Sequence, residues 1–337
     1  MKQFKLFPLI ALIAVVVTAC NATATTAAPP EVPQIKVGYS ALTADPSVVW
    51  VAKESGHFTK NSFTAIELNL IPGGSRAAQA LINSEIQFGI FSATAVIEAN
   101  AAGGDLMMIA SFDNALTYDF VVQPGIRKSE DVKGKRLGVS GASGSSVTAT
   151  RYILREFFKL DIDKDITLVT IGNEEDRLAA LQAKKIDGAV LDPVAAIRAK
   201  KAGLVILASL GSNGIPYQGS SLVVSRRFAE KNPQTARAFL RSMVEAISFY
   251  KDARNRDAVK KILGIYFQSN DAEYLENNYN KMVAQLQPLP YVADGGVKII
   301  LDESKKAKEK GLTLPDVINN ALLKELEVSG FVAGLYK

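Results

Sequence analysis

Short apolar runs alternate with helical patterns from Ile35 onwards. Each run is short, mostly apolar and flanked by polar or glycine-containing segments, which is typical of buried strands. Strands separated by helices indicate a parallel sheet, so the pattern predicts an α/β fold. The predicted strands lie at 35–40, 65–71, 86–91, 106–112, 136–140, 166–171, 186–191 and 204–210.

The chain also matches itself at an offset of 100 residues. Lys36 to Ala99 aligns with Arg136 to Ala199 without gaps and with 12 identities in 64 positions, among them Gly38 with Gly138. The order of strands, loops and helices recurs in step, which carries more weight than the identities. We therefore predict two lobes of similar construction, each with a mainly parallel sheet flanked by helices.

Loops that follow the predicted strands are the first candidates for a binding site. In open α/β sheets, ligands bind beyond the carboxyl ends of strands, where the N-termini of helices also point. Gly73 and Gly74 let the backbone approach a ligand closely, and Ser75 can cap a helix that begins at Arg76. The six loops cover 40–45, 72–75 and 92–94 in the first half and 140–146, 172–175 and 192–193 in the second.

Two loops of the second half have distinctive chemistry. The hydroxyl-rich run 141–146 precedes a predicted helix from Val147 to Lys159, and such a helix N-terminus favours anions or strong acceptors. Asp192 has two open roles. It can cap the helix that Pro193 begins, or it can accept a hydrogen bond from a ligand amine, amide or imino group.

The pattern changes after Leu210. A glycine-rich segment, 211–219, leads to an apolar strand and then to a mostly helical region that extends to Lys337. We expect Ser220 to Val224 to rejoin the first sheet, so that two segments cross between the lobes and form a hinge around a cleft. The predicted division is 35–121 plus 219–337 for the first lobe and 122–218 for the second.

The N-terminus carries a separate signal. Lys2 and Lys5 precede an apolar run that ends at Val17, which describes a secretory signal peptide and is too short for a membrane span. The following Val17-Thr18-Ala19-Cys20 resembles a bacterial lipobox, in which the cysteine is lipidated. We expect residues 1–19 to be removed and 20–34, which are small, polar and proline-rich, to form a flexible linker.

Charge and cysteine content narrow the class of protein. The net charge is +5, and it becomes +3 without the two lysines of the signal peptide. Acidic and basic residues alternate along the predicted helices, which is typical of a solvated surface and not of a nucleic-acid interface. Cys20 is the only cysteine, so the chain has no internal disulfide and its stability must come from core burial.

Several motifs, in order, resemble those of the substrate-binding proteins of nitrate, taurine and aliphatic-sulfonate importers and of their relatives that bind thiamine-pyrimidine precursors. They are VGYS at 37–40, PGGS-R-AAQAL at 72–81, DVKGKRLGVSGASGSS at 131–146 and IDGAVLDP at 186–193. The resemblance implies a type II periplasmic-binding-protein fold of two lobes with the ligand cleft between them. It also implies that the protein delivers a small solute to an ABC permease and its ATPase. Together with the signal peptide and Cys20, this leads us to expect an exported, lipid-anchored monomer in the cell envelope.

The resemblance also implies how the ligand is held. Small hydroxyl residues and helix N-termini would bind an anionic group, whereas Asp45 and Asp192 disfavour a bare anion and suit a ligand that also carries donors. Trp50, Asn114 and Tyr217 could add stacking or hydrogen bonds. The candidate ligand-binding residues are Ser40, Ala41, Asp45, Trp50, Gly73, Gly74, Ser75, Ser92, Ala93, Asn114, Ser143, Gly144, Ser145, Ser146, Asp192 and Tyr217.

Two rival functions remain at this stage. Some pyrimidine-related members of the superfamily are synthases, but they use a cysteine-rich motif and a histidine. Here Cys20 and His57 are the only residues of those types, which argues against metal or thiol chemistry, and we expect no cofactor and no metal. A ligand-sensing ectodomain would need the same two lobes as a transport protein.

Overall fold

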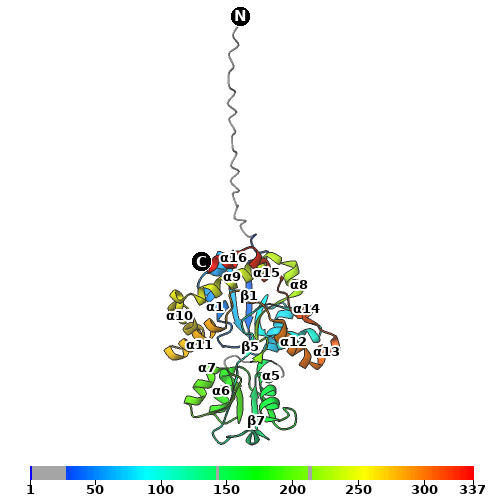
Figure 1. Ribbon diagram of the computed structural model, residues 1–337, viewed down its shortest axis with the longest axis vertical. Coiled ribbons are helices and arrows are strands. Elements are labelled where there is room, and N and C mark those ends of the chain that lie inside the picture. Colours follow the sequence, from blue (N-terminus) through cyan, green and yellow to red (C-terminus); the bar gives the residue numbers. More distant parts are fainter. Residues whose placement is uncertain (2–27, 142–143, 212–214) are drawn as a thin grey trace.

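Two sheets, each covered by helices, form the two lobes of the molecule (Figure 1). The computed structural model describes Met1 and residues 28–141, 144–211 and 215–337. The predicted signal peptide, Cys20 and Ser143 lie outside the described residues. Within the described part of the chain, no helix combines the length and apolar composition that a membrane span requires.

The first sheet has five strands, and four of them come from the N-terminal third of the chain. The fourth strand in its order, β12, is antiparallel to both of its neighbours, β3 and β4. The predicted return of 220–224 to the first sheet is therefore confirmed. The strand order is β2 (Ala65–Leu70), β1 (Gln34–Tyr39), β3 (Phe88–Ser92), β12 (Ser220–Ser225) and β4 (Leu106–Ser111).

The second sheet also has five strands and a single antiparallel one, β6, which pairs with β9 and β10. Because β6 begins at Asp119, the predicted lobe boundary after residue 121 falls inside this strand. The strand order is β10 (Val205–Ser209), β6 (Asp119–Val122), β9 (Gly188–Leu191), β7 (Arg136–Val139) and β8 (Thr167–Thr170).

The two halves of the repeat adopt equivalent positions. β1 pairs with β2 so that Lys36 lies opposite Glu67, and β7 pairs with β8 so that Arg136 lies opposite Thr167. Helices α3 (Gly74–Ile82) and α6 (Glu174–Gln182) begin and end at matching residues. The offset of 100 residues therefore describes two α/β units with the same strand register.

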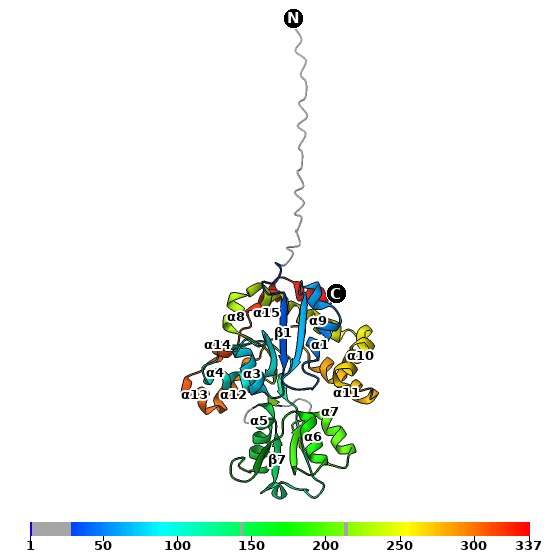
Figure 2. The same cartoon turned by 180° about the vertical axis from the view of Figure 1, so that it is seen from behind.

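Helices of the second lobe are few, and the long C-terminal region belongs to the first lobe (Figures 1 and 2). The second lobe has α5 (Ser145–Tyr152), the π-helix Ile153–Phe158, α6, α7 (Pro193–Lys201) and the 3-10 helix Ser129–Val132. The first lobe has α1 (Ser47–Glu54), α2 (His57–Lys60), α3, α4 (Ala93–Ala101), α8 (Arg226–Lys231), α9 (Pro233–Lys251), the 3-10 helix Ala253–Asn255, α10 (Arg256–Phe267), α11 (Ala272–Gln285), α12 (Asp294–Glu303), α13 (Lys305–Lys310), α14 (Leu314–Val317), α15 (Ala321–Val328) and α16 (Phe331–Leu335).

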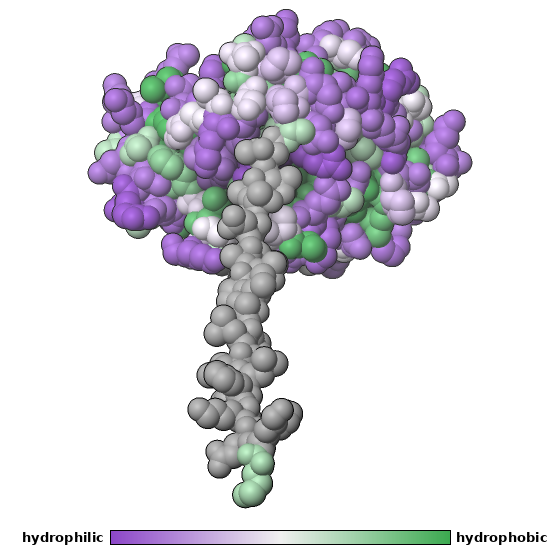
Figure 3. Space-filling view, turned by 90° about the horizontal axis from the view of Figure 1, so that it is seen from above, coloured by the Kyte–Doolittle hydropathy of each residue, from purple (hydrophilic) through white to green (hydrophobic). Residues whose placement is uncertain are grey.

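Helix α9 forms the centre of the first lobe's core. Pro233 occupies its first turn, where a missing N–H costs nothing. The fully buried Phe239 stacks on Phe88 of β3 with ring centroids 3.9 Å apart. Seen from above this lobe, the surface is mostly hydrophilic and its apolar residues are scattered (Figure 3), as expected for solvated helices.

The described chain attaches to the first lobe before β1 begins. Glu31 accepts hydrogen bonds from the backbone N–H groups of Gln234 and Thr235, at 3.0 and 2.7 Å. These groups belong to the first turn of α9, so the carboxylate satisfies donors that have no partner within the helix. The predicted linker therefore overlaps residues that are held on the lobe, and Gln34 already belongs to β1.

Candidate functional site

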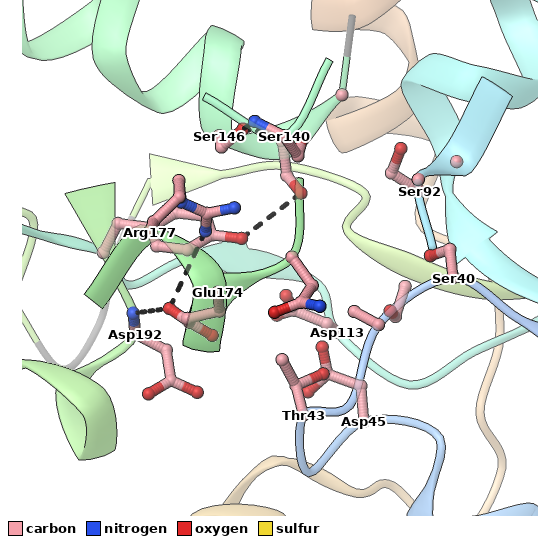
Figure 4. A pocket seen from close by; sticks show the side chains of 18 of the residues that line it. Ser40, Thr43, Asp45, Ser92, Asp113, Ser140, Ser146, Glu174, Arg177 and Asp192 are labelled. Atoms are coloured by element: carbon pink, nitrogen blue, oxygen red, sulfur yellow. Dashed lines mark hydrogen bonds and ion pairs between the residues drawn. The ribbon is translucent and has the colours of Figure 1, made fainter. Parts of the chain in front are cut away.

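A polar pocket lies between the two lobes, where loops after the strands of both sheets meet (Figure 4). The space within its lining is about 800 Å³, a figure that includes the part open to solvent. Its lining residues are Ser40, Ala41, Thr43, Asp45, Gly73, Gly74, Ser92, Asp113, Thr117, Tyr118, Ser140, Gly144, Ser145, Ser146, Gly172, Asn173, Glu174, Arg177, Asp192, Ser220 and Lys281.

Three helix N-termini contribute hydroxyl groups and glycines to one part of the pocket. Gly74 begins α3, Ser92 precedes α4, and Ser145 begins α5. A larger residue at position 74 would require a shift of α3 or α4, because a Cβ atom there would lie 2.9 Å from Cβ of Ala95 in α4. The free N–H groups at such helix ends, together with serine hydroxyls, favour an anionic group of a ligand.

Two serines at the start of α5 differ in what they contact. Ser146 is buried; its Oγ accepts a hydrogen bond from the backbone N–H of Ser140 at 3.0 Å and lies 2.8 Å from Oγ of Ser140. Ser145 is half-buried, and its Oγ accepts a hydrogen bond from the hydroxyl of Tyr118 at 3.3 Å. Ser146 therefore holds the loop in shape, whereas Ser145 is the more accessible of the two to a ligand.

Four carboxyl groups line another part of the pocket, those of Asp45, Asp113, Glu174 and Asp192 (Figure 4). Burial, reinforced by the charge of Asp45, raises the pKa of Asp113 to about 7. Burial and the charge of Asp192 raise the pKa of Glu174 to about 8. These two groups keep protons near neutral pH, which reduces the negative charge of the pocket.

Asp192 takes the capping role, the first of the two roles that the sequence leaves open. Its Oδ1 accepts the backbone N–H of Ala195 at 2.8 Å and so caps α7, which confirms the capping prediction. Its other oxygen, Oδ2, lies 3.1 Å from Nζ of Lys281. Although burial alone would raise the pKa of Asp192, the charge of Lys281 and the capping N–H groups lower it, so the carboxylate stays ionised.

Two basic side chains reach the pocket. Nη1 of Arg177 donates to the carbonyl oxygen of Gly172 at 2.9 Å, and Nη2 lies 4.0 Å from Oε1 of Glu174. Lys281, from α11 of the first lobe, lies between Asp192 and Asp45, with Nζ 3.4 Å from Oδ1 of Asp45. Burial would lower the pKa of Lys281, but the two carboxylates outweigh it and hold its pKa well above the ordinary value.

Ten of the sequence-predicted residues line this pocket. They come from both halves of the repeat, from the loops that follow β1 and β3 and precede α3, and from their counterparts in the second lobe. They are Ser40, Ala41, Asp45, Gly73, Gly74, Ser92, Gly144, Ser145, Ser146 and Asp192.

Five others lie elsewhere. Trp50 is fully buried and stacks on Tyr266 with centroids 4.7 Å apart, so it belongs to the core of the first lobe. Ser75 does not cap α3, because the helix already begins at Gly74; it lines a second groove outside the pocket. Ala93 is buried at the start of α4, and its N–H donates to the carbonyl oxygen of Gly219 at 3.1 Å.

Asn114 and Tyr217 belong to the segments that cross between the lobes. The hydroxyl of Ser111 donates to Oδ1 of Asn114 at 2.7 Å, and the N–H of Tyr217 donates to the carbonyl oxygen of Asn114 at 3.2 Å. Tyr217 is fully buried. A backbone hydrogen bond therefore joins the two crossings at these residues, and neither side chain lines the pocket.

Six lining residues lie outside the six predicted loops and are not among the candidates. Asp113, Thr117, Tyr118 and Ser220 lie in the crossing segments, Arg177 follows the first turn of α6, and Lys281 lies in α11. The offset of 100 aligns Arg177 with Ala77, so the repeat gave no sign of it. Among the described residues, no group of three or more histidine, cysteine or acidic side chains is placed to hold a metal ion.

Two similar α/β lobes with a polar pocket between them define a two-lobed solute-binding protein of the periplasmic-binding-protein fold. The chain belongs to the NMT1-like family, whose family model matches residues 28–264. This confirms the superfamily and the fold predicted from the sequence motifs.

Individual relatives agree with this assignment. The taurine-binding periplasmic protein of Escherichia coli (strain K12) is 26% identical over 299 residues, which cover 85% of this chain and 89% of that protein. The periplasmic nitrate-binding protein of Synechocystis PCC 6803 has 13% identity and a TM-score of 0.72, with 92% of each chain covered. The alkanesulfonate-binding protein of Xanthomonas axonopodis pv. citri, solved with MOPS bound, has 21% identity and a TM-score of 0.66, with 87% of this chain and 100% of that chain covered.

These relatives are binding proteins, which fits the expectation that the chain is not an enzyme. They also indicate a small-molecule ligand and a location in the cell envelope.

Proposed function

We propose that this protein is the solute-binding component of an ABC importer and that its pocket takes a small organic zwitterion, with an amino-sulfonate such as taurine as the first candidate. One observation carries the proposal. The pocket combines helix N-termini and serine hydroxyls with a cluster of four carboxyl groups. The first set suits an anionic group and the second a cationic amine, so a ligand that has both satisfies the whole pocket.

The charge of the pocket argues against a bare anion such as nitrate. With Asp113 and Glu174 keeping their protons, the carboxylates of Asp45 and Asp192 balance the two basic groups, so the lining has no net positive charge to pair with an anion. A free anion would bring an uncompensated negative charge into a partly buried site, which is costly. An ammonium group on the ligand offsets that cost, and the taurine-binding protein of Escherichia coli is a relative whose name fits this chemistry.

Closure of the lobes is the proposed mechanism of capture. Lining residues come from both lobes, so a bound solute would contact both and stabilise the closed arrangement. The short antiparallel pair β5 (Ala115–Leu116) and β11 (Ile215–Pro216) joins the two crossing segments, and we infer that the lobes rotate about it.

Export and lipidation at Cys20 complete the proposal. Mature protein would be held at a membrane surface by the lipid and would present its pocket to a permease. Replacing Cys20 by Ser should release the protein from the membrane fraction after cell breakage. If the Cys20→Ser protein sediments with membranes as completely as the natural sequence does, lipid anchoring through this residue is wrong.

Ligand titration of the soluble form, residues 21–337, tests the binding proposal. Taurine should bind at least ten times more tightly than ethanesulfonate, which lacks the amine, and than nitrate. A ligand present at 100 times its Kd should stabilise the fold by about 2.7 kcal/mol, which a thermal-shift screen detects. Equal affinity for taurine and ethanesulfonate would exclude the zwitterion, and no response to sulfonates, nitrate or pyrimidines would exclude the pocket as a solute site.

Uptake measurements separate import from sensing. Deletion of the gene should abolish accumulation of the ligand in cells that otherwise take it up. Unchanged uptake, together with a lost transcriptional response to the ligand, would identify a sensing ectodomain instead.

A further inference from the structure

Lys281 lies deep between the lobes although it belongs to a helix far from the repeat. Its Nζ is 3.1 Å from Asp192 of the second lobe and 3.4 Å from Asp45 of the first. The Lys281 side chain is 16% exposed, that of Asp45 is 14% exposed and that of Asp192 is 11% exposed. An ammonium group is rarely buried to this extent without paired carboxylates, so its place here is set by charge.

The packing of α11 determines where this ammonium group lies. Met282, the next residue, is fully buried in the core of the first lobe. On the side of the second lobe, Glu273 of α11 pairs with Lys201 of α7 at 2.6 Å, and Arg198 of α7 lies over the ring of Tyr274 at 4.9 Å. The helix is therefore held against both lobes, and Lys281 is fixed in the pocket.

No other basic group of the pocket lining pairs with Asp45 or Asp192 in the described part of the chain. Arg177 is engaged with Gly172 and lies beside Glu174. Oδ1 of Asp45 is buried and accepts no hydrogen bond from any described residue, so its ion pair with Lys281 is its principal interaction there. Without Lys281, two adjacent carboxylates would face each other in a poorly solvated space with no counter-ion.

Carboxylates in that situation take up either a proton or a cation. The lysine side chain supplies the cation from within the protein. It thereby removes one of the positions at which a positively charged ligand group would otherwise bind.

We propose that Lys281 is a specificity-determining residue that occupies a cation subsite formed by Asp45 and Asp192 and so limits the ligand to one cationic group. The inference rests on the proposed function, because it takes this pocket as the solute site. With Lys281 present, a single ligand amine can still approach Asp113 and Glu174, and its positive charge would favour release of the protons that these two groups keep in the unliganded pocket. Ligands with two amines, or cations without an anionic group, are rejected because the second subsite is filled.

The test uses n-propylammonium, which reproduces the end of a lysine side chain and has no anionic group. Lys281→Met keeps the apolar stem of the side chain but lacks the terminal ammonium group, and so vacates the subsite. Isothermal titration of the soluble form should show that Lys281→Met binds n-propylammonium at least ten times more tightly than the natural sequence does. A matching rise in melting temperature should appear only in this variant.

Lys260→Met is the matched control. Lys260 also pairs with two carboxylates, Asp257 and Glu276, each at 3.3 Å, but it lies on α10 away from the pocket. This variant should respond to n-propylammonium as the natural sequence does.

The proposal would be overturned if the affinity of Lys281→Met for n-propylammonium were within threefold of the affinity of the natural sequence. If the two uncompensated carboxylates prevent this variant from folding, Lys281→Met with Asp45→Asn leaves one of them and is held to the same tenfold criterion. Because the probe is not a zwitterion, a natural sequence that binds no zwitterion contradicts the proposed function without affecting this result.

Discussion

The hydroxyl group of Tyr217 lies 3.2 Å from Oγ1 of Thr148 and is also hydrogen-bonded to Oγ1 of Thr94. Thr94 is in α4 of the first lobe and Thr148 is in α5 of the second. The tyrosine itself belongs to a crossing segment and is fully buried. One buried hydroxyl thus connects both lobes close to the pocket.

Tyr217→Phe should lower the free energy of unfolding by about 1–2 kcal/mol, because it removes buried hydrogen bonds and leaves two threonine hydroxyls without this partner. Urea unfolding measures the change. Tyr152→Phe, on the same helix as Thr148, is the control and should change stability by less than about 0.5 kcal/mol. An unaltered unfolding midpoint for Tyr217→Phe would show that the connection between the lobes contributes no stability.

The two serines at the start of α5 should separate into a structural and a binding residue. Ser146→Ala leaves the partly buried N–H of Ser140 without its 3.0 Å acceptor and should cost about 1–2 kcal/mol of stability. Ser145→Ala should change stability little and weaken taurine binding several-fold. Urea unfolding and taurine titration of both variants check this. If Ser145→Ala left taurine binding unchanged, the anionic group of the ligand would not lie at Ser145.

The buried acid Glu174 makes stability depend on pH. Its pKa is raised from 4.5 to about 8, so the folded state keeps a proton that the unfolded state releases in this interval. The stabilising contribution is complete below about pH 4.5 and is lost as the pH rises towards 8. We expect the unliganded protein to lose stability between pH 5 and 8 with a slope of up to about 1.4 kcal/mol per pH unit from this group.

Glu174→Gln should flatten that slope while its amide oxygen still accepts the N–H of Asp192. Melting temperatures across the pH range measure it. Glu230→Gln, an exposed glutamate of α8, should leave the slope unchanged. A natural sequence that is equally stable at pH 5 and pH 8 would mean that Glu174 is ionised throughout.

Replacing either of two neighbouring glycines in α12 by alanine should change the stability of the protein, in opposite directions for the two positions. A Cβ atom at Gly296 would lie 2.7 Å from the backbone N of Gln218 and from the carbonyl carbon of Tyr217, so a crossing segment would have to move. We expect Gly296→Ala to cost about 1–3 kcal/mol. A Cβ at Gly295 meets nothing within 4 Å, and Gly295→Ala should stabilise the helix by about 0.5–1 kcal/mol. Thermal unfolding of both variants measures these changes, and a neutral Gly296→Ala would contradict the close approach.

Local sequence patterns were sufficient for the framework of the fold. Apolar runs marked the strands, and the offset of 100 predicted two units of similar construction. The structure gives these units equivalent registers, with Lys36 opposite Glu67 and Arg136 opposite Thr167. Loops at strand ends could be located in the same way, because the carboxyl ends of parallel strands meet at one edge of a sheet. Most of the predicted pocket residues therefore line the pocket.

Contacts between distant segments were beyond reach of the sequence. Trp50 follows the first predicted loop closely in the sequence, and only its stack on Tyr266, from a helix late in the chain, shows that it belongs to the core. Lys281 lies in a helix with no motif, and its role depends on how α11 packs against both lobes. Burial and charge pairing set such positions, and neither has a local pattern.

The position of strand β12 affects the order in which the two lobes can fold during synthesis. It lies between β3 and β4, so these two strands cannot be joined within the first sheet until residues 220–225 have been made. All strands of the second sheet, in contrast, lie between residues 119 and 209. In a chain that emerges N-terminus first, the second lobe can close its sheet while the first is still incomplete, and the synthesis of β12 then completes the half of the molecule that began earliest.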